Sequence, residues 1–142
     1  MRSDFPLPDV DWPLTAGYWA AAARRELAIP RCASCARWVW YPAARCPSCG
    51  GDDMPWTVTS GKGRLYSWSI VRHVFLPAFA SKVPYAVGLV ALDEDPAVRV
   101  AGPLLGDHER LTAGMPVAVE FRPLRFDGVP GEVLAPHFGP GG

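Results

Sequence analysis

The chain has 142 residues, enough for one ordinary domain or for one small domain with an added module. Fourteen basic and fourteen acidic residues give a formal net charge of zero, which excludes a global electrostatic attraction for DNA or RNA. An apolar content of 49% together with 14 Gly and 16 Pro favours a β-rich, turn-rich globular protein over a disordered one.

The start of the chain, MRSDFPLPDVDWP, does not look like a targeting segment. It has one Arg and lacks the apolar core of a signal peptide. The longest apolar stretch, residues 85–92, is far too short to span a membrane. We therefore expect a cytoplasmic protein with no membrane partner.

Residues 1–29 are expected to form an extended arm followed by one short helix. Three prolines favour the arm. Thr15 can cap a helix start, strong helix formers follow it, and Pro30 stops the helix. We expect a helix over about 15–27 and no other convincing one.

Residues 30–52 hold all four cysteines, in two C-x-x-C pairs separated by ten residues. Each pair can form a tight turn that presents two thiolates, and two such turns close a tetrahedron around Zn²⁺. Four protein ligands leave no position for a catalytic water, so the metal is expected to be structural. Iron or a thiol–disulfide pair is the alternative. The expected ligands are Cys32, Cys35, Cys46 and Cys49.

The residues that follow the two cysteine pairs differ. Gly50 follows Cys49 and readily adopts the left-handed backbone that closes such a turn. Ala36 follows Cys35, and its Cβ makes the same conformation less favourable.

Three cations flank the cysteines and allow two interpretations. Arg31, Arg37 and Arg45 could form a phosphate-binding patch. They could also offset the double negative charge of Zn²⁺ bound by four thiolates, and we favour this second interpretation.

The run Trp-Val-Trp-Tyr between the cysteine pairs needs something to cover it. Trp38 and Trp40 share one face of an extended strand, and Val39 and Tyr41 share the other. A ribbon of about twenty residues is too thin to hide both faces. The cover could be the N-terminal helix or the barrel of the same chain, or it could be another polypeptide.

Residues 53–138 are expected to form a five-stranded barrel of the OB type, with a β-sandwich as the alternative fold. After a turn at Gly61 to Gly63, alternating residues predict a strand over about 65–71, and an apolar run predicts a central strand over 85–93. The other strands are expected at 98–106 (with a break at Gly102 and Pro103), at 117–121 and at 132–135. The irregular connection between the third and fourth strands is typical of this Greek-key barrel. Residues 139–142 are expected to be a frayed tail.

Basic and aromatic residues are interleaved on the first barrel strand. Lys62, Arg64 and Arg72 bracket Tyr66 and Trp68. This pattern suits single-stranded nucleic acid, and it equally suits the phosphates and adenine ring of a nucleotide-like cofactor. A solvated strand with core aromatics is the third interpretation.

No pattern in the chain identifies a catalytic centre. The three histidines (His73, His108 and His137) lie outside the known metal-binding and catalytic motifs. The sequence also lacks a serine elbow, a P-loop and a dinucleotide fingerprint. We therefore expect no catalytic residue.

The order of several motifs resembles a known protein family. The motifs are YW in the helix, then CASC, CPSCG, SGKGRLYSWSIV, PYAVGLVALD and GMPVAVEF. This order is similar to that of the rubredoxin-like zinc-ribbon plus OB-fold proteins associated with acyl-CoA metabolism, over about residues 14–138. Ala36 departs from the Gly usual at its position.

The resemblance implies a non-catalytic role beside an acyl-CoA enzyme. Such proteins are commonly encoded beside, or fused to, thiolase-superfamily enzymes and enoyl-CoA hydratases. They complete or stabilise the assembly, and are thought to guide the CoA thioester between active sites. One actinobacterial branch partners a lipid-transfer-protein-type thiolase homologue, a retro-aldolase that cleaves the steroid side-chain CoA thioester after hydration.

Our first hypothesis is an accessory subunit of an acyl-CoA thiolase or aldolase in steroid side-chain degradation. The ribbon and the helix would dock on the enzyme, and basic residues of the first barrel strand would lie near the CoA phosphates. The expected docking residues are Tyr18, Trp19, Trp38 and Trp40, and the expected phosphate contacts are Lys62, Arg64 and Arg72.

The second hypothesis is a single-strand nucleic-acid binder that stacks bases on Tyr66 and Trp68. The third is a free-standing enzyme, although we expect no acyl-CoA turnover by this chain alone.

Overall fold

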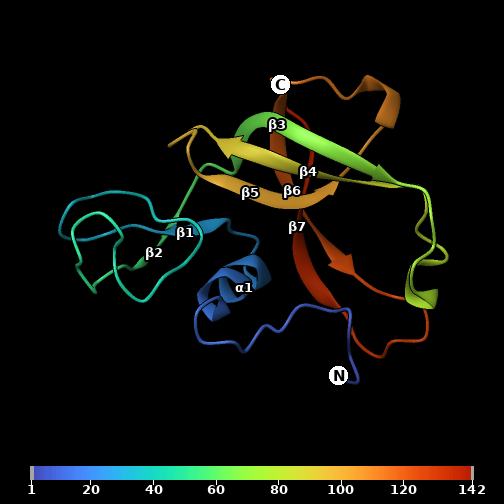
Figure 1. The fold of residues 1–142 in the computed structure, drawn as a ribbon, viewed down its shortest axis with the longest axis horizontal. Helices are drawn as coiled ribbons and strands as arrows, with labels where there is room; N and C mark the ends of the chain where they lie inside the picture. The colour runs from blue at the N-terminus through green and yellow to red at the C-terminus, as the bar shows by residue number, and fades with distance from the viewer. Residues whose placement is uncertain (1, 142) are drawn as a thin grey trace.

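The computed structural model describes residues 2–141, which form one α-helix, seven strands and two 3₁₀ turns (Figure 1). The helix is α1 (Ala16–Ala23), and the turns are η1 (Pro77–Phe79) and η2 (His108–Arg110). The strands are β1 (Ala28–Pro30), β2 (Trp56–Val58), β3 (Lys62–Val71), β4 (Tyr85–Leu92), β5 (Arg99–Leu104), β6 (Pro116–Leu124) and β7 (Val133–Pro140). Within residues 2–141, no helix combines the length and apolar character needed to cross a membrane.

Five strands close a barrel in the order β3-β4-β5-β7-β6, with β6 also pairing to β3. Neighbouring strands are antiparallel except β5 and β7, which are parallel and meet at the pair Leu104 and Phe138. This confirms the predicted OB-type barrel.

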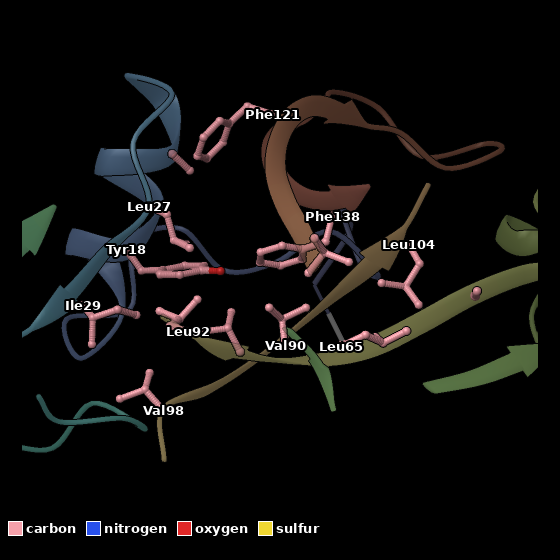
Figure 2. Packing of buried hydrophobic residues seen from close by; sticks show 14 residues of the cluster. Tyr18, Leu27, Ile29, Leu65, Val90, Leu92, Val98, Leu104, Phe121 and Phe138 are labelled. Carbon is pink, nitrogen blue, oxygen red and sulfur yellow. The ribbon is translucent and has the colours of Figure 1, made fainter. Parts of the chain in front are cut away.

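The helix belongs to the barrel core. Figure 2 shows Tyr18 and Leu27 pointing toward the side chains of Val90 and Phe138 inside the barrel. Phe138 is completely buried. Because α1 contributes to this shared core, the N-terminal segment and the barrel fold as one unit.

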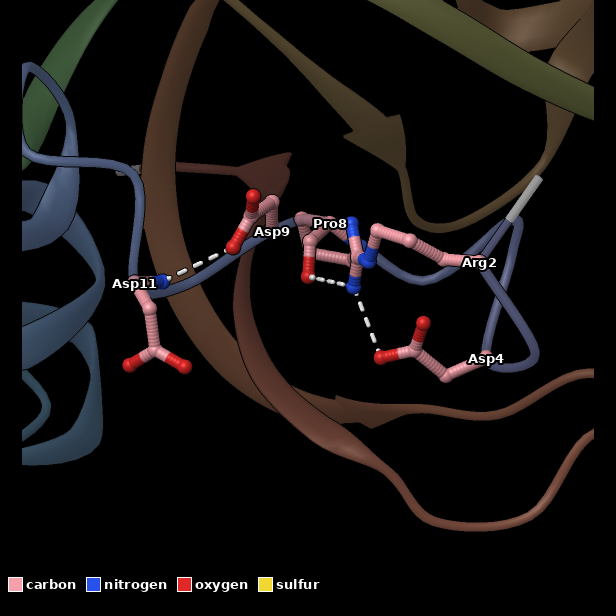
Figure 3. A network of polar contacts seen from close by, with 5 residues as sticks. All are labelled: Arg2, Asp4, Pro8, Asp9 and Asp11. Atoms are coloured by element: carbon pink, nitrogen blue, oxygen red, sulfur yellow. Dashed lines mark hydrogen bonds and ion pairs between the residues drawn. The ribbon is translucent and has the colours of Figure 1, made fainter.

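The N-terminal arm is ordered against the body of the protein. Leu7 is buried, and Arg2 binds the Asp4 carboxylate at 2.7 Å and the Pro8 carbonyl at 3.4 Å (Figure 3). The Asp9 carboxylate accepts a hydrogen bond from the Asp11 N–H. The arm is therefore a folded strap along the protein.

The helix ends at Ala23, so the prediction that it extends to about residue 27 is wrong. Arg25 has a left-handed backbone with φ of 61°, and the Glu26 N–H donates to the Ala21 carbonyl at 3.0 Å. A Gly usually takes the Arg25 position in such a helix end. Without that Gly, the sequence contains no signal for the stop.

The ribbon begins and ends on a short ladder that we did not predict. Ala28 pairs with Val58 and Pro30 pairs with Trp56, so β1 and β2 hold the two ends of the cysteine module together (Figure 1). The chain then enters the barrel through the Thr59 turn, whose hydroxyl donates to the Leu27 carbonyl at 2.8 Å.

Two barrel strands differ from the predictions. β5 continues through Gly102 and Pro103, which pair with Gly88 and Val87 on β4. β7 continues to Pro140, and Gly139 pairs with Ala118, so the predicted frayed tail is wrong as far as residue 140. Residue 142 lies outside the described residues.

Candidate metal centre and docking surfaces

The four cysteine sulfurs converge on one point. The Sγ atoms all lie within 4.8 Å of one another, with 3.5 Å between Cys32 and Cys49 and 3.7 Å between Cys35 and Cys46. Ligands 2.3 Å from Zn²⁺ at the corners of a tetrahedron are about 3.8 Å apart. The cysteines therefore fit a tetrahedral metal ion, and Cys32, Cys35, Cys46 and Cys49 are brought together as predicted.

The two cysteine turns are built alike. The Ala36 N–H donates to the Cys32 carbonyl at 2.8 Å, and the Gly50 N–H donates to the Cys46 carbonyl at 2.9 Å. Ala36 and Gly50 both have left-handed backbones, with φ of 62° and 77°. The strain expected at Ala36 is present in the fold.

Backbone donors prepare part of the cluster to bind a cation. Backbone hydrogen bonds from Cys49 and Ser48 lower the pKa of the Cys46 thiol to about 6. At Cys49 a backbone hydrogen bond from Gly51 lowers the pKa, but the crowded sulfurs of Cys32 and Cys35 raise it to about 11. Four thiolates this close need a divalent cation to stay ionised together, as they are in a zinc ribbon.

Two of the flanking arginines support the turns. Arg31 Nε donates to the Ala36 carbonyl at 2.9 Å, and Arg45 Nη1 donates to the Gly50 carbonyl at 3.3 Å. The Arg31 guanidinium also lies 4.7 Å from the centre of the Trp38 ring. These contacts place positive charge beside the sulfur cluster, in agreement with the charge-offsetting interpretation.

The aromatic run is covered mainly by the chain itself. Val39 packs beside Cys32 and Cys46 on the metal side, whereas Trp38 and Trp40 pack against the main apolar core. The Trp40 ring lies 5.3 Å from the Tyr18 ring.

Tyr18 is only 7% exposed and is part of the interior, so it offers a partner little surface, and its predicted role in docking stays a prediction. Trp19, Trp38 and Trp40 are half-buried, and their contact with a partner stays a prediction.

A cleft of about 440 Å³ opens where the arm, the helix, the ribbon and the barrel meet. Its walls include Trp12, Tyr41 and Arg99, and both Trp12 and Tyr41 are exposed. No local sequence pattern indicates this cleft, because its residues come from four separate segments.

The basic residues of the first barrel strand form no common site. Lys62 and Arg64 line a cavity of about 260 Å³ beside Asp93. Arg72 follows the other end of β3. At a rise of 3.3 Å per residue, the Cα atoms of Arg64 and Arg72 are up to roughly 26 Å apart. The structure brings Lys62 and Arg64 together but leaves Arg72 apart.

The proposed base-stacking pair is also split. The β3–β4 register shifts between Leu65 and Ser67, which marks a bulge at Tyr66. After the bulge, Trp68 pairs with Gly88, which is buried on the inner face of the sheet. Paired residues share a face, so Trp68 also lies on the inner face, although its side chain is exposed. Tyr66 is on the outer face under the Arg99 guanidinium, 3.9 Å away. Two platforms on opposite faces do not form one nucleic-acid track.

An exposed apolar segment that we did not predict follows β3. Val74, Phe75 and Leu76 follow β3 and are 39%, 78% and 40% exposed. Their apolar run is typical of a strand that continues, so the sequence does not indicate that these side chains face solvent.

Family models match most of the chain. Residues 19–55 match the rubredoxin-like zinc ribbon domain of ChsH2, and residues 56–122 match the C-terminal OB-fold domain of ChsH2. A solved chain described as "Ltp2-ChsH2(DUF35) aldolase" is 33% identical, with a TM-score of 0.79 over 94% of this chain and 98% of that one.

The chain belongs to the ChsH2 (DUF35) family. The Cys₄ module of this ChsH2-family chain is therefore a zinc ribbon, and the metal that its cysteines fit is structural Zn²⁺.

Curated relatives extend the comparison. A probable enoyl-CoA hydratase alpha subunit from Thermomonospora curvata is 36% identical over 105 residues, which is 73% of this chain and 32% of that protein. A DUF35 domain-containing scaffold protein from Pyrococcus furiosus is 35% identical over 80 residues, which is 56% of this chain and 57% of that protein. The chain thus spans about a third and just over half of the length of these relatives.

A more distant structure shares only the fold. A DUF35-family protein of unknown function from Sulfolobus solfataricus is 11% identical, with a TM-score of 0.57 over 91% of this chain and 86% of that one.

Proposed function

We propose that this ChsH2-family chain is a non-catalytic accessory subunit that binds and completes a thiolase-superfamily acyl-CoA enzyme. The proposal rests on the structural match to a chain of the Ltp2–ChsH2(DUF35) aldolase. The match covers 98% of that chain. The scaffold role printed for the Pyrococcus relative supports the same kind of activity.

The chemistry of the chain agrees with a supporting role. All four positions of the metal are filled by Cys side chains, which leaves no open position for substrate or water.

The finer proposal is a retro-aldolase partner that acts on a steroid side-chain CoA thioester supplied by an enoyl-CoA hydratase. The hydratase link is supported by the Thermomonospora relative, whose matched segment is about a third of a probable hydratase subunit. Lys62 and Arg64 are the proposed contacts for the CoA phosphates, since they share one cavity. Arg72 follows the other end of β3, outside this cavity, and stays a separate proposed contact.

The test is the turnover of a β-hydroxy steroid side-chain CoA thioester by an Ltp2-like protein from the organism that encodes this chain. We expect the rate of cleavage to rise at least tenfold when this chain is added, and the KM to rise when Lys62 and Arg64 are both changed to Ala. A rate indifferent to this chain would overturn the proposal.

A further inference from the structure

The most exposed large apolar side chain of residues 2–141, Phe75, lies in the loop between β3 and β4. Phe75 is 78% exposed, more than any other large apolar residue that stands out at the surface of residues 2–141, and Val74 and Leu76 lie on either side of it. Three adjacent apolar residues in water are unfavourable, and such patches often mark binding sites. We call residues 72–76 the β3–β4 tip.

The base of this loop is fixed, so the exposure of the tip does not come from a loose segment. Phe79 packs against Tyr85 and Phe126, with ring centres 5.7 and 4.9 Å apart. The Asp127 carboxylate accepts hydrogen bonds from the Ser81 N–H at 3.1 Å and the Ser81 hydroxyl at 2.9 Å. The β6–β7 loop thus holds the β3–β4 loop in place (Figure 1), and a loop ordered in advance loses less entropy on binding.

Two cations and one fixed carboxylate belong to the loops around the tip. Arg72 and Lys82 are without a carboxylate partner among residues 2–141, and Lys82 lies 4.9 Å from the centre of the Phe126 ring. The Asp127 carboxylate is held by Ser81. The His73 ring packs edge-on against Phe75 at 4.7 Å. An apolar tip flanked by cations is complementary to an apolar pocket rimmed by acidic residues.

The position of the tip in the fold is suited to binding. In OB folds the loop after the first strand and the loop between the last two strands carry much of the binding surface. In this barrel they are the β3–β4 loop and the β6–β7 loop, which are tied together. The ribbon aromatics instead pack largely against the core of the chain.

We propose that the β3–β4 tip docks this chain on its enzyme by inserting Phe75 into an apolar pocket with an acidic rim. The occupant is the thiolase-superfamily subunit, so the inference rests on the proposed function and adds the surface that recognises the enzyme. Aromatic side chains that fill pockets dominate the energetics of protein interfaces.

The experiment measures the Kd between this chain and an Ltp2-like protein from the same organism by calorimetric titration. The test variant is the double substitution Phe75→Ser and Leu76→Ser. The matched control is Tyr41→Ser, which removes an aromatic side chain that is 57% exposed on the ribbon. Since all three side chains face solvent, thermal unfolding should show that both variants fold.

We expect the double variant to raise the Kd at least tenfold and Tyr41→Ser to change it less than twofold. Arg72→Glu should slow association and weaken its salt dependence. Wild-type affinity in the double variant would overturn the tip assignment alone, whereas no binding by the wild-type chain would overturn the proposed function as well. Phe75-dependent binding to vesicles of anionic phospholipid, with enzyme binding unchanged in the double variant, would assign the tip to a membrane instead.

Discussion

Ala36 and Gly50 occupy equivalent positions in the two cysteine turns, and both have left-handed backbones. Such a conformation costs about 1–2 kcal/mol in a residue with a Cβ. Gly50 avoids this cost, and Ala36 does not. The first turn therefore carries strain that the second turn lacks.

We predict that Ala36→Gly strengthens the ribbon. Relief of the strain, less about 0.4–1 kcal/mol for the greater freedom of Gly in the unfolded chain, leaves a gain of about 0.5–1 kcal/mol. The check is a zinc competition titration with a chromophoric chelator, in which affinity should rise about two- to fivefold. Gly50→Ala is the control and should lower it; a loss of affinity in Ala36→Gly would contradict the account.

His137 is the buried titratable residue of the barrel. Burial lowers its pKa below the ordinary value of 6.5, although Nδ1–H donates to the Ala135 carbonyl at 2.9 Å. The unfolded chain therefore binds a proton more readily than the folded chain when the pH drops below about 6.5. The stability contributed by neutral His137 is complete above that pH and is lost as the pH falls toward the lowered pKa.

We predict that the free energy of unfolding falls between pH 7.5 and 5.5, and that His137→Gln shows a smaller fall. Urea unfolding at both pH values measures it. Because zinc binding also weakens in acid, the comparison between the two proteins isolates the histidine. An identical pH dependence in both would rule out His137 as a source.

At the scale of elements, α1 connects the ribbon to the barrel. Tyr18 contacts Trp40 of the ribbon and belongs to the core that includes Phe138 of the barrel. Gly17 lets α1 approach β2 closely, because a Cβ at this position would collide with the Trp56 indole. The close approach explains a Gly in the first turn of a helix, where it is otherwise unfavourable.

We predict that Gly17→Ala destabilises the protein by about 1–3 kcal/mol, as overpacking does. In an ordinary exposed helix position the same change stabilises by about 1 kcal/mol. Ala23→Gly, at the exposed end of α1, is the control for helix propensity and should destabilise by less. The sign of the Gly17→Ala effect in chemical denaturation decides between the two expectations.

Some elements could be predicted from the sequence because their signals are local. The spacing of the cysteines predicted the ribbon, and the apolar run over 85–92 predicted the central strand β4. The bulge at Tyr66 could not be predicted, since alternation from Tyr66 to Ile70 looks unbroken and only pairing with β4 reveals the shift. The β1–β2 ladder is also invisible locally, because each strand has three residues without a period.

The candidate surfaces depended even more on tertiary structure. The position of α1 decides which face of Trp38 and Trp40 is covered. The sequence pattern does not contain that position. The 78% exposure of Phe75 depends on the path of the β3–β4 loop, which the sequence pattern does not contain.

At the scale of the whole molecule, zinc and the barrel stabilise different parts. The ribbon has a small apolar cluster of its own (Cys32, Val39 and Cys46, with Met54 against it), separate from the large shared core. Such a cluster is too small to fold without the metal, whose binding supplies about 10–16 kcal/mol in zinc-finger peptides.

We predict that a strong chelator unfolds the ribbon and leaves the barrel folded. Trp38 and Trp40 should move into water, so tryptophan emission should shift to longer wavelength, while the β-type circular dichroism persists. Cys46→Ser should reproduce this state without chelator. Loss of all structure on zinc removal would show that the barrel depends on the ribbon.

Association with a thiolase-superfamily enzyme is the central claim, and co-expression with an Ltp2-like protein from the organism that encodes this chain tests it most directly. The account predicts that the two proteins co-elute from a sizing column as one complex at fixed stoichiometry, and that the complex survives moderate salt. Separate elution of two folded, zinc-loaded proteins would contradict it.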